Sequence, residues 1–349
     1  MEGTIPARAL AVSGVALLLL TAGATVPASS GRPDLSGPAH ASGTGPRVLV
    51  HSAKARPHHS RTTARWSGSI RVSTLSAVDD AYTRAFDSGL GLDTGWTGND
   101  SRCNPGTTSA ASRAATLRAV NFVRAMSGLA PVTFSPTLNT RSQRTALMMS
   151  ANGALSHTPP RSWRCWSQAG AANAGRSNLA LSYPSITSAG LVELYMRDPG
   201  ADTGAVGHRR WLLNPFATTM GTGSTDTANA MTVVGPTATH RPNPAWVSWP
   251  TAGYFPTTLE PGGRWSLSAG NKLMDFRRAT VRVYRDGRSV RATKLRVHNG
   301  YAQPTLVWQL PAGAAASGTF KVVVRGAHLK GSRASFGRSY VVRLFEPSS

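Results

Sequence analysis

Cysteine, lysine and acidic residues are all scarce in this chain of 349 residues. Its two cysteines, Cys103 and Cys165, do not form a Cys-x-x-Cys motif, which argues against a zinc ribbon or a thioredoxin-type redox site. Only 15 residues are Asp or Glu, whereas 38 are Lys or Arg, and five of these are lysines. The resulting net charge of +23 is carried mainly by arginine, and it either attracts polyanions or reflects a compositional bias towards arginine.

Long hydrophobic runs are also missing, with one exception near the N-terminus. Residues 9–20 form an apolar run after Arg8, and small-residue cleavage candidates end at Ala24 and Ala28. Because a run of this length is short for a membrane span, residues 1–28 are predicted to be a secretory signal peptide rather than an uncleaved anchor. We therefore expect a secreted, extracellular protein without a transmembrane segment in its mature form.

Secretion determines what is expected of the two cysteines. In an oxidising compartment, Cys103 and Cys165 are expected to form a disulfide, and the alternative is a pair of free buried thiols. Closing a loop of this length stabilises a fold by about 4 kcal/mol when the gain is attributed to the entropy of the unfolded chain.

Composition divides the rest of the chain into three parts. Residues 29–72 are rich in Gly, Pro, Ser, Ala, Arg and His, and are predicted to be a disordered linker. Residues 73–238 have helical periodicity, whereas residues 239–349 consist of short runs rich in Val, Trp, Tyr and Thr between turn signals. From Arg241 onward there are 17 Lys and Arg against four Asp and Glu, so this part has a net charge of +13.

Capping signals predict where the helices begin and end. Ser109 or Ser112 caps a helix that ends before Gly128, and Ser135-Pro136 begins a second helix that ends near Gly153. Further helices are expected over 76–86, 188–198 and 207–213, followed by two strands over 217–223 and 229–235.

The last part of the chain is expected to be an all-β sandwich of the immunoglobulin or fibronectin kind. Asp286-Gly287 predicts a tight hairpin, and Tyr254-Phe255-Pro256 is interpreted as a packed turn. Alternation along the strands predicts an apolar inner face and a basic outer face. We expect Val281, Val283 and Val290 to point inward, and Arg282, Arg285 and Arg291 to point outward. The expected strands are 245–249, 264–268, 280–284, 289–297, 305–309, 319–324 and 340–345.

Two histidine motifs frame the helical part of the chain. The first is Leu155-Ser156-His157, and the second is Gly207-His208-Arg209 followed by Leu212-Leu213-Asn214-Pro215. Asn178-Leu179-Ala180 lies between them, and Asn121-Phe122-Val123-Arg124 precedes them. In this order and spacing, residues 110–235 resemble the bacterial secreted branch of the CAP family, also called the SCP or pathogenesis-related-1 family. The resemblance implies an α+β fold, an α-β-α sandwich with a central cleft.

The resemblance also implies which residues line that cleft. His157 and His208 occupy the two histidine positions. Ser177 stands where the family has its first glutamate, and Asp198 follows Tyr195 where a second acid can stand. Three further residues support the motifs without a role of their own: Asn178, Gly207 and Arg209.

Because the glutamate is missing, two chemical interpretations of the histidine pair remain. With Asp198, the two histidines could hold a divalent metal such as zinc and leave a position open to water, although no cofactor is required. Ser177 is a poor metal ligand and cannot replace a glutamate as general base. Alternatively, His157 bonds local backbone near Pro159-Pro160 and His208 caps the short helix that it opens.

Three functions remain open on these grounds. No HExxH motif, P-loop or Gly-x-Ser-x-Gly nucleophile elbow occurs in the sequence. The first hypothesis is a non-catalytic binding module for a lipid or a small wall component, docked by its basic sandwich on an anionic cell-wall polymer or lipid surface. The alternatives are a metal-dependent hydrolase that uses the histidine pair, and an extracellular adhesion or interaction scaffold. No nucleic acid is expected as a partner, and the protein is expected to be a monomer.

Overall fold

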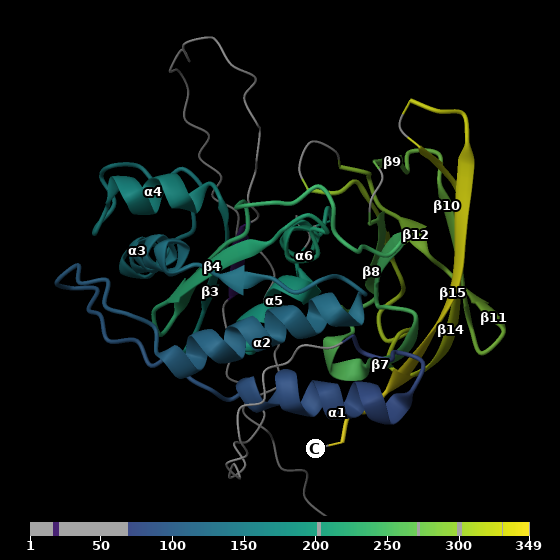
Figure 1. Cartoon of the computed structure of the whole chain (residues 1–349), viewed down its shortest axis with the longest axis horizontal. Coiled ribbons are helices and arrows are strands. Elements are labelled where there is room, and N and C mark those ends of the chain that lie inside the picture. The colour runs from purple at the N-terminus through teal and green to yellow at the C-terminus, as the bar shows by residue number, and fades with distance from the viewer. Residues whose placement is uncertain are drawn as a thin grey trace, which may run out of the picture.

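The chain folds into an α+β part followed by a β-rich part, which lie side by side (Figure 1). The computed structural model describes residues 17–20, 69–200, 204–270, 273–298, 302–329 and 331–348. Most of the predicted signal peptide and residues 29–68 of the predicted linker lie outside these ranges. Ile70, at the end of the predicted linker, is buried in the hydrophobic core.

The helices of the α+β part begin and end close to the expected positions. Ser109 caps α2 by accepting a hydrogen bond from the backbone of Ser112, and Ser135 caps α3 with Pro136 in its first turn. Gly153 ends α3 in the left-handed conformation, with φ of 56°. The helices are α1 (Leu75–Ala85), α2 (Ala110–Met126), α3 (Pro136–Asn152), α4 (Gln168–Ala174), α5 (Gly190–Arg197) and α6 (Gly207–Leu212), with a 3-10 turn at Asp87–Gly89.

A five-stranded sheet of order β1-β3-β5-β4-β2 forms the centre of this part. Helices α3 and α4 cover one face, and α2 and α5 lie on the other (Figure 1), which gives the three layers of an α-β-α sandwich. The strands are β1 (Leu17–Leu20), β2 (Thr133–Phe134), β3 (Ser177–Ser182), β4 (Thr219–Ser224) and β5 (Ala228–Thr232). Strand β1 falls within the predicted signal peptide and pairs antiparallel with β3.

Two glycines of β4 allow α3 to lie directly on the sheet. A Cβ atom on Gly221 would collide with Leu138, and one on Gly223 would collide with the backbone of Gln143. The side chain of Gln143 then donates to the backbone oxygen of Ser224 at 2.8 Å. The sequence around Met220-Gly221-Thr222-Gly223 therefore sets the distance between this helix and the sheet.

The β-rich part consists of two sheets. One has β11-β10-β14-β15-β7 in that order, with β9 beside β14, and the other has β12-β13-β8-β6. All pairs are antiparallel except β7 with β15. The strands are β6 (Trp246–Trp249), β7 (Gly253–Pro256), β8 (Arg264–Ala269), β9 (Met274–Asp275), β10 (Thr280–Arg285), β11 (Arg288–Val290), β12 (Thr293–Lys294), β13 (Thr305–Gln309), β14 (Gly318–Leu329) and β15 (Ser335–Phe345), with a 3-10 turn at Thr257–Leu259.

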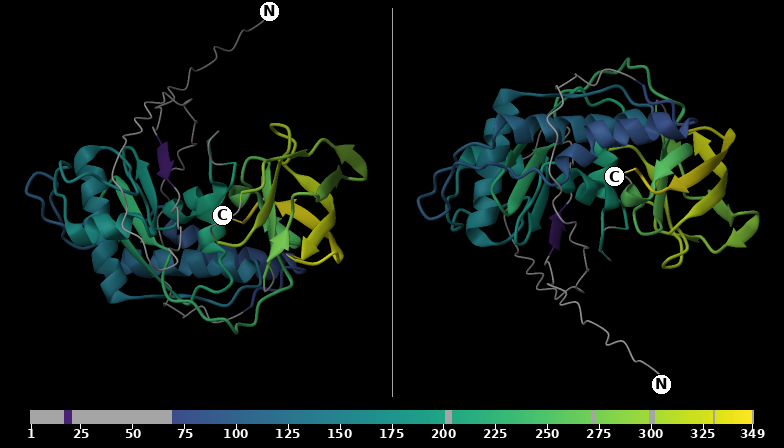
Figure 2. Two further views of the ribbon diagram at one scale, coloured as in Figure 1. Left: turned by 90° about the horizontal axis from the view of Figure 1, so that it is seen from above. Right: turned by 90° about the horizontal axis from the view of Figure 1, so that it is seen from below.

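Aromatic side chains fill the space between these two sheets. The ring of Trp265 on β8 meets that of Phe320 on β14 edge to face, with centroids 5.2 Å apart. Trp308 on β13 packs against Trp265 in the same way at 6.5 Å, and all three side chains are fully buried. The two views of Figure 2 show that the chain end returns towards α1, where the backbone of Ser348 donates to Asp79.

Three expectations for the β-rich part are wrong. The single strand expected over 289–297 is divided into β11 and β12, which belong to different sheets. Tyr254-Phe255-Pro256 forms strand β7 rather than a turn, because it pairs in parallel with β15 at the edge of its sheet. Arg285 does not point outward with Arg282: it shares the face of Val283, and its guanidinium lies 5.9 Å from the ring of Phe320. Side chains at every second position of a strand share a face. Arg282 and Arg285 are three positions apart on β10, so they lie on opposite faces and cannot both point outward.

Two other expectations, the disulfide and the hairpin at Asp286-Gly287, are confirmed. Cys103 and Cys165 form a disulfide that closes a separation of 62 residues. Asp286-Gly287 turns the hairpin between β10 and β11, with both residues at positive φ and with Arg285 paired to Arg288. Within the described ranges, no helix is both long enough and apolar enough to cross a membrane.

Candidate functional site

Asp198 and His208 form a buried hydrogen-bonded pair between two helices. Asp198 ends α5 in the left-handed conformation, with φ of 50°, which turns its carboxylate towards α6. One carboxylate oxygen accepts from Nδ1 of His208 at 2.7 Å. The other accepts from the backbone N–H of His208 at 3.0 Å, so Asp198 caps the N-terminus of α6. Both side chains are completely buried.

An aromatic ring and an amide hold this pair in place. The ring of Tyr195 stacks on that of His208 with centroids 5.4 Å apart, and burial raises the pKa of the Tyr195 hydroxyl. That hydroxyl donates to Oδ1 of Asn229 on β5 at 2.9 Å. The side chain of Asn178 on β3 donates to the backbone oxygen of His208 at 3.1 Å. His208 is therefore fixed from the sheet and from both helices.

Ser177 and His157 both bind the end of α4. The hydroxyl of Ser177 donates to the backbone oxygen of Asn173 at 2.8 Å and accepts from its side-chain amide at 3.0 Å. Nδ1 of His157, which is half-buried, lies 2.9 Å from the backbone oxygen of Ala174. The predicted backbone partner near Pro159-Pro160 is thus replaced by Ala174. Ser177 and Asn178 are adjacent on β3 but have different partners. Ser177 contacts the end of α4, as His157 does, whereas Asn178 contacts His208.

The residues around His208 fit one metal ligand but not a complete zinc site. A carboxylate that accepts from Nδ1 of a histidine leaves Nε2 directed for a metal, and Nε2 of His208 has no hydrogen-bond partner in the described residues. Zinc centres use at least three protein ligands. No group of three or more His, Cys, Asp or Glu side chains with such an arrangement occurs in the described ranges, and Ser177 is bonded to Asn173.

Arg209 and Arg210 connect α6 to the β-rich part. Arg209 is fully buried, and its guanidinium donates to the backbone oxygens of Met196 at 2.7 Å and Arg264 at 2.8 Å, and to the hydroxyl of Ser266 at 3.0 Å. Burial lowers the pKa of Arg209 to about 10. Arg210 donates to the backbone oxygen of Gln303 at 3.0 Å. The second histidine motif therefore leads directly into the contact between the two parts of the chain.

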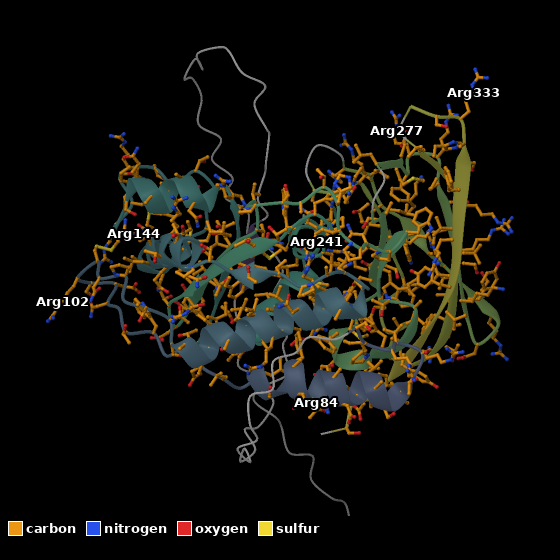
Figure 3. The ribbon with its side chains drawn as sticks, viewed as in Figure 1. Arg84, Arg102, Arg144, Arg241, Arg277 and Arg333 are labelled. Carbon is orange, nitrogen blue, oxygen red and sulfur yellow. A yellow bond between two sulfur atoms is a disulfide. The ribbon has the colours of Figure 1, made fainter. Side chains whose placement is uncertain are left out.

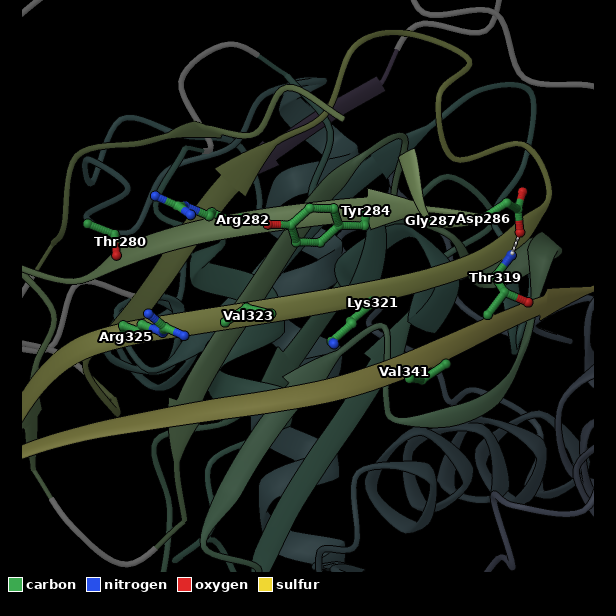
Figure 4. A pocket seen from close by; sticks show the side chains of 10 residues that line it. All are labelled: Thr280, Arg282, Tyr284, Asp286, Gly287, Thr319, Lys321, Val323, Arg325 and Val341. Atoms are coloured by element: carbon green, nitrogen blue, oxygen red, sulfur yellow. Dashed lines mark hydrogen bonds between the residues drawn. The ribbon is translucent and has the colours of Figure 1, made fainter. Parts of the chain in front are cut away.

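A hollow of about 630 Å³ lies on the outer face of the larger β-sheet (Figure 4). Strands β10 and β14 supply most of its lining, and three of these side chains are cationic: Arg282, Lys321 and Arg325. Tyr284 lies beside Lys321 in the strand register. We call the hollow lined by these four side chains the basic groove. The side chains of Arg282, Lys321 and Arg325 form no ion pair or hydrogen bond with any residue that the structure describes.

The acidic residues near the basic groove are already engaged. Asp286, at one end of the groove, accepts from the backbone of Thr319 at 3.0 Å and lies 3.7 Å from Nε of Arg285. Asp275 pairs with Arg277 at 2.6 Å. Glu260 is buried and accepts from the indole of Trp265 at 2.7 Å. Three of the four acids of the β-rich part thus have other partners, and none of the three pairs with a cation of the basic groove.

Arginines also occur well outside the β-rich part. Figure 3 labels Arg102 and Arg144 at one end of the molecule and Arg277 and Arg333 at the other. Some arginines of the α+β part have a structural role: Arg124 is buried and donates to the backbone oxygens of Leu212 and Asn214 at 2.8 and 2.9 Å. Total charge alone therefore does not distinguish one surface from another, whereas the basic groove is a local cluster of cations on one face of a sheet.

Comparison with known proteins identifies one segment of the chain. Residues 117–235 match the CAP family, described as the cysteine-rich secretory protein family. No curated protein matches the chain. Among solved structures, the crystal structure of PcoC, a methionine-rich copper resistance protein from Escherichia coli, is similar to part of this chain. The match covers 28% of this chain and 93% of the PcoC chain, with 16% sequence identity and a TM-score of 0.21.

Proposed function

Residues 117–235 of this chain are a CAP domain, and from this premise we propose that the protein is an exported, non-catalytic binding module. Its ligand is an anionic polymer of the cell surface, and the β-rich part is the docking element. The observation that carries the proposal is the basic groove, where three cations without partners in the described residues line one hollow together with an aromatic side chain. Cations in a concave surface concentrate anionic ligands through the local field.

Binding without turnover agrees with the state of the residues at the family's cleft positions. Ser177 replaces the glutamate, and its hydroxyl is already bonded to Asn173. His208 and Asp198 are completely buried and fix one helix to another. A general base must reach a proton of the substrate, and neither side chain is exposed to do so.

A polymer fits the surface better than a membrane does. Binding to a lipid surface uses apolar side chains that enter the bilayer as well as cations. Among the described residues, the exposed large hydrophobic side chains are Leu75, Tyr183 and Leu273, and none of them lines the groove.

A salt series tests this proposal. Purified anionic wall polymer is incubated with the full chain at increasing salt concentrations, and bound protein is measured by sedimentation. We expect retention at low salt and release as salt rises, because electrostatic binding releases counterions. Vesicles of anionic lipid serve as the comparison, and equal retention on vesicles would favour a lipid surface instead. Absence of salt-sensitive retention on either material contradicts the proposal, and capture of a single protein partner would favour an adhesion scaffold.

One observation favours metal binding as a second candidate function. Nε2 of the oriented ring of His208 has no hydrogen-bond partner in the described residues. Zinc titration by calorimetry, with wild type and His157→Ala, tests a metal site that uses both histidines. Such a site requires uptake by the wild type that the variant loses, and equal uptake by both proteins removes this candidate.

A further inference from the structure

The cations of the basic groove follow a regular arrangement along the sheet. In the register of β10 with β14, Tyr284 lies opposite Lys321, Arg282 opposite Val323, and Thr280 opposite Arg325. Arg282 therefore occupies the level between Lys321 and Arg325. Figure 4 shows these side chains on one face of the two strands.

The spacing of these levels follows from strand geometry. Successive levels are two residues apart, which corresponds to about 7 Å along a strand. Lys321, Arg282 and Arg325 thus present one positive charge at each of three successive levels, alternating between two neighbouring strands. A flexible chain lying along β14 would meet a cation at each step.

The end of the row at Lys321 differs in character from the rest. At this end Asp286 accepts from the backbone of Thr319, and its negative charge ends the attraction for an anion. Tyr284 lies at the level of Lys321 and contributes an aromatic surface to the same hollow. Aromatic rings in such positions contact the uncharged parts of a ligand, such as a polyol or sugar unit.

We propose that the basic groove is a binding site for a linear polyanion of the polyol-phosphate class, extended along β14, with its negative charges about 7 Å apart. Arg282, Lys321 and Arg325 each bind one phosphate, and Tyr284 contacts the carbon chain next to the phosphate that Lys321 binds. This assignment rests on the proposed function, because it names the ligand class and the site for a protein that binds an anionic polymer. A free phosphate or a monomeric polyol phosphate would occupy one level only, and would bind far more weakly than the polymer.

Matched variants of the full chain test the site. The groove variant carries Arg282→Gln, Lys321→Gln and Arg325→Gln. The control variant removes the same charge from exposed positions that do not line the groove: Arg288→Gln, Arg291→Gln and Arg333→Gln. The register of β11 places Arg288 opposite Arg285, on the other face of the sheet from Tyr284. Circular dichroism and thermal unfolding establish that both variants are folded.

Fluorescence anisotropy with labelled poly(glycerol phosphate) is then measured at several salt concentrations. Three phosphate contacts to a flexible chain give a slope of about −2 in log affinity against log salt, so wild-type affinity falls about 16-fold for a fourfold rise in salt. The groove variant should lose this part of the slope, whereas the control variant should keep most of it. Tyr284→Ala should weaken binding several-fold and leave the slope unchanged.

The outcomes separate the site from the proposed function. Equal losses in the groove and control variants overturn the groove assignment, while salt-sensitive binding by the wild type still supports an anionic ligand. No binding by the wild type contradicts both. Competition by glycerol phosphate as strong as that of the polymer, at equal phosphate concentration, overturns the extended row. Wild-type binding to anionic vesicles that exceeds binding to the polymer assigns the surface to lipid instead.

Discussion

Replacing Asp198 should destabilise the fold through α6 rather than through lost chemistry. Asp198→Ala removes the acceptor for Nδ1 of His208 and for the backbone N–H groups of His208 and Arg209. Losing a helix cap costs about 1 kcal/mol, and leaving buried donors without an acceptor costs a further 1–3 kcal/mol, roughly. Alanine also tolerates the positive φ of this position less well than aspartate does. We expect the free energy of unfolding to fall by about 4 kcal/mol in total.

Asp198→Asn is the matched control for this prediction. Asparagine keeps the size and adopts positive φ readily, but it has one acceptor oxygen in place of two, so we expect a loss of about 1–2 kcal/mol. Urea unfolding followed by circular dichroism measures both variants against the wild type. A loss below about 1 kcal/mol for Asp198→Ala would refute the capping role. So would an Asn variant less stable than the Ala variant.

Three further predictions concern other parts of the fold. Arg209→Lys keeps a charge but cannot reach the same set of acceptors, so the free energy of unfolding should fall by about 3 kcal/mol in urea titrations; an unchanged midpoint contradicts this. Cys103→Ala with Cys165→Ala should lower that free energy by about 4 kcal/mol, measured without reductant, and an unfolding midpoint equal to that of the wild type would contradict the account. Burial raises the pKa of Glu260, so the folded protein keeps this proton to higher pH than the unfolded chain, and stability should fall as pH rises above the ordinary pKa of glutamate. Glu260→Gln should remove that part of the pH dependence, and urea midpoints on both sides of this window decide it.

Much of the α+β part could be predicted because local signals determine its helices. Ser109, Ser135 and Gly153 have the capping roles expected of them. Helix α4 and strand β3 were not expected, because α4 has only seven residues and β3 is buried along most of its length, with no alternation of polar and apolar positions. Short helices and fully buried strands lack the periodicity on which such a prediction depends.

For the histidine site, the motif positions predicted which residues meet but not how deeply they are buried. The sequence predicted His208 and Asp198 as members of one site, and they are in contact. It could not show that this contact is completely buried, since burial depends on how α5, α6 and the β-rich part pack together. The direction of the hydroxyl of Ser177 depends likewise on α4, which the sequence did not indicate.

The basic groove could be predicted from the sequence only in part. Alternation predicted that Arg282 faces outward, and the same rule applied to Lys321 and Arg325 would have placed them on one face of β14. Which strands are neighbours could not be read from the sequence, because β10 pairs with β14 across a long separation. The level at which Arg282 lies between Lys321 and Arg325 is a consequence of that pairing.

In the function that we propose, the basic groove binds the ligand and the histidine motifs do not. The most direct test of this proposal compares the affinity of poly(glycerol phosphate) for wild type, His157→Ala and the groove variant at one low salt concentration. His157 is half-buried and outside the groove, so His157→Ala should bind like the wild type, whereas the groove variant should bind at least tenfold more weakly, by roughly 1.4 kcal/mol. Wild-type affinity in the groove variant, or a loss of binding in His157→Ala, would contradict the account.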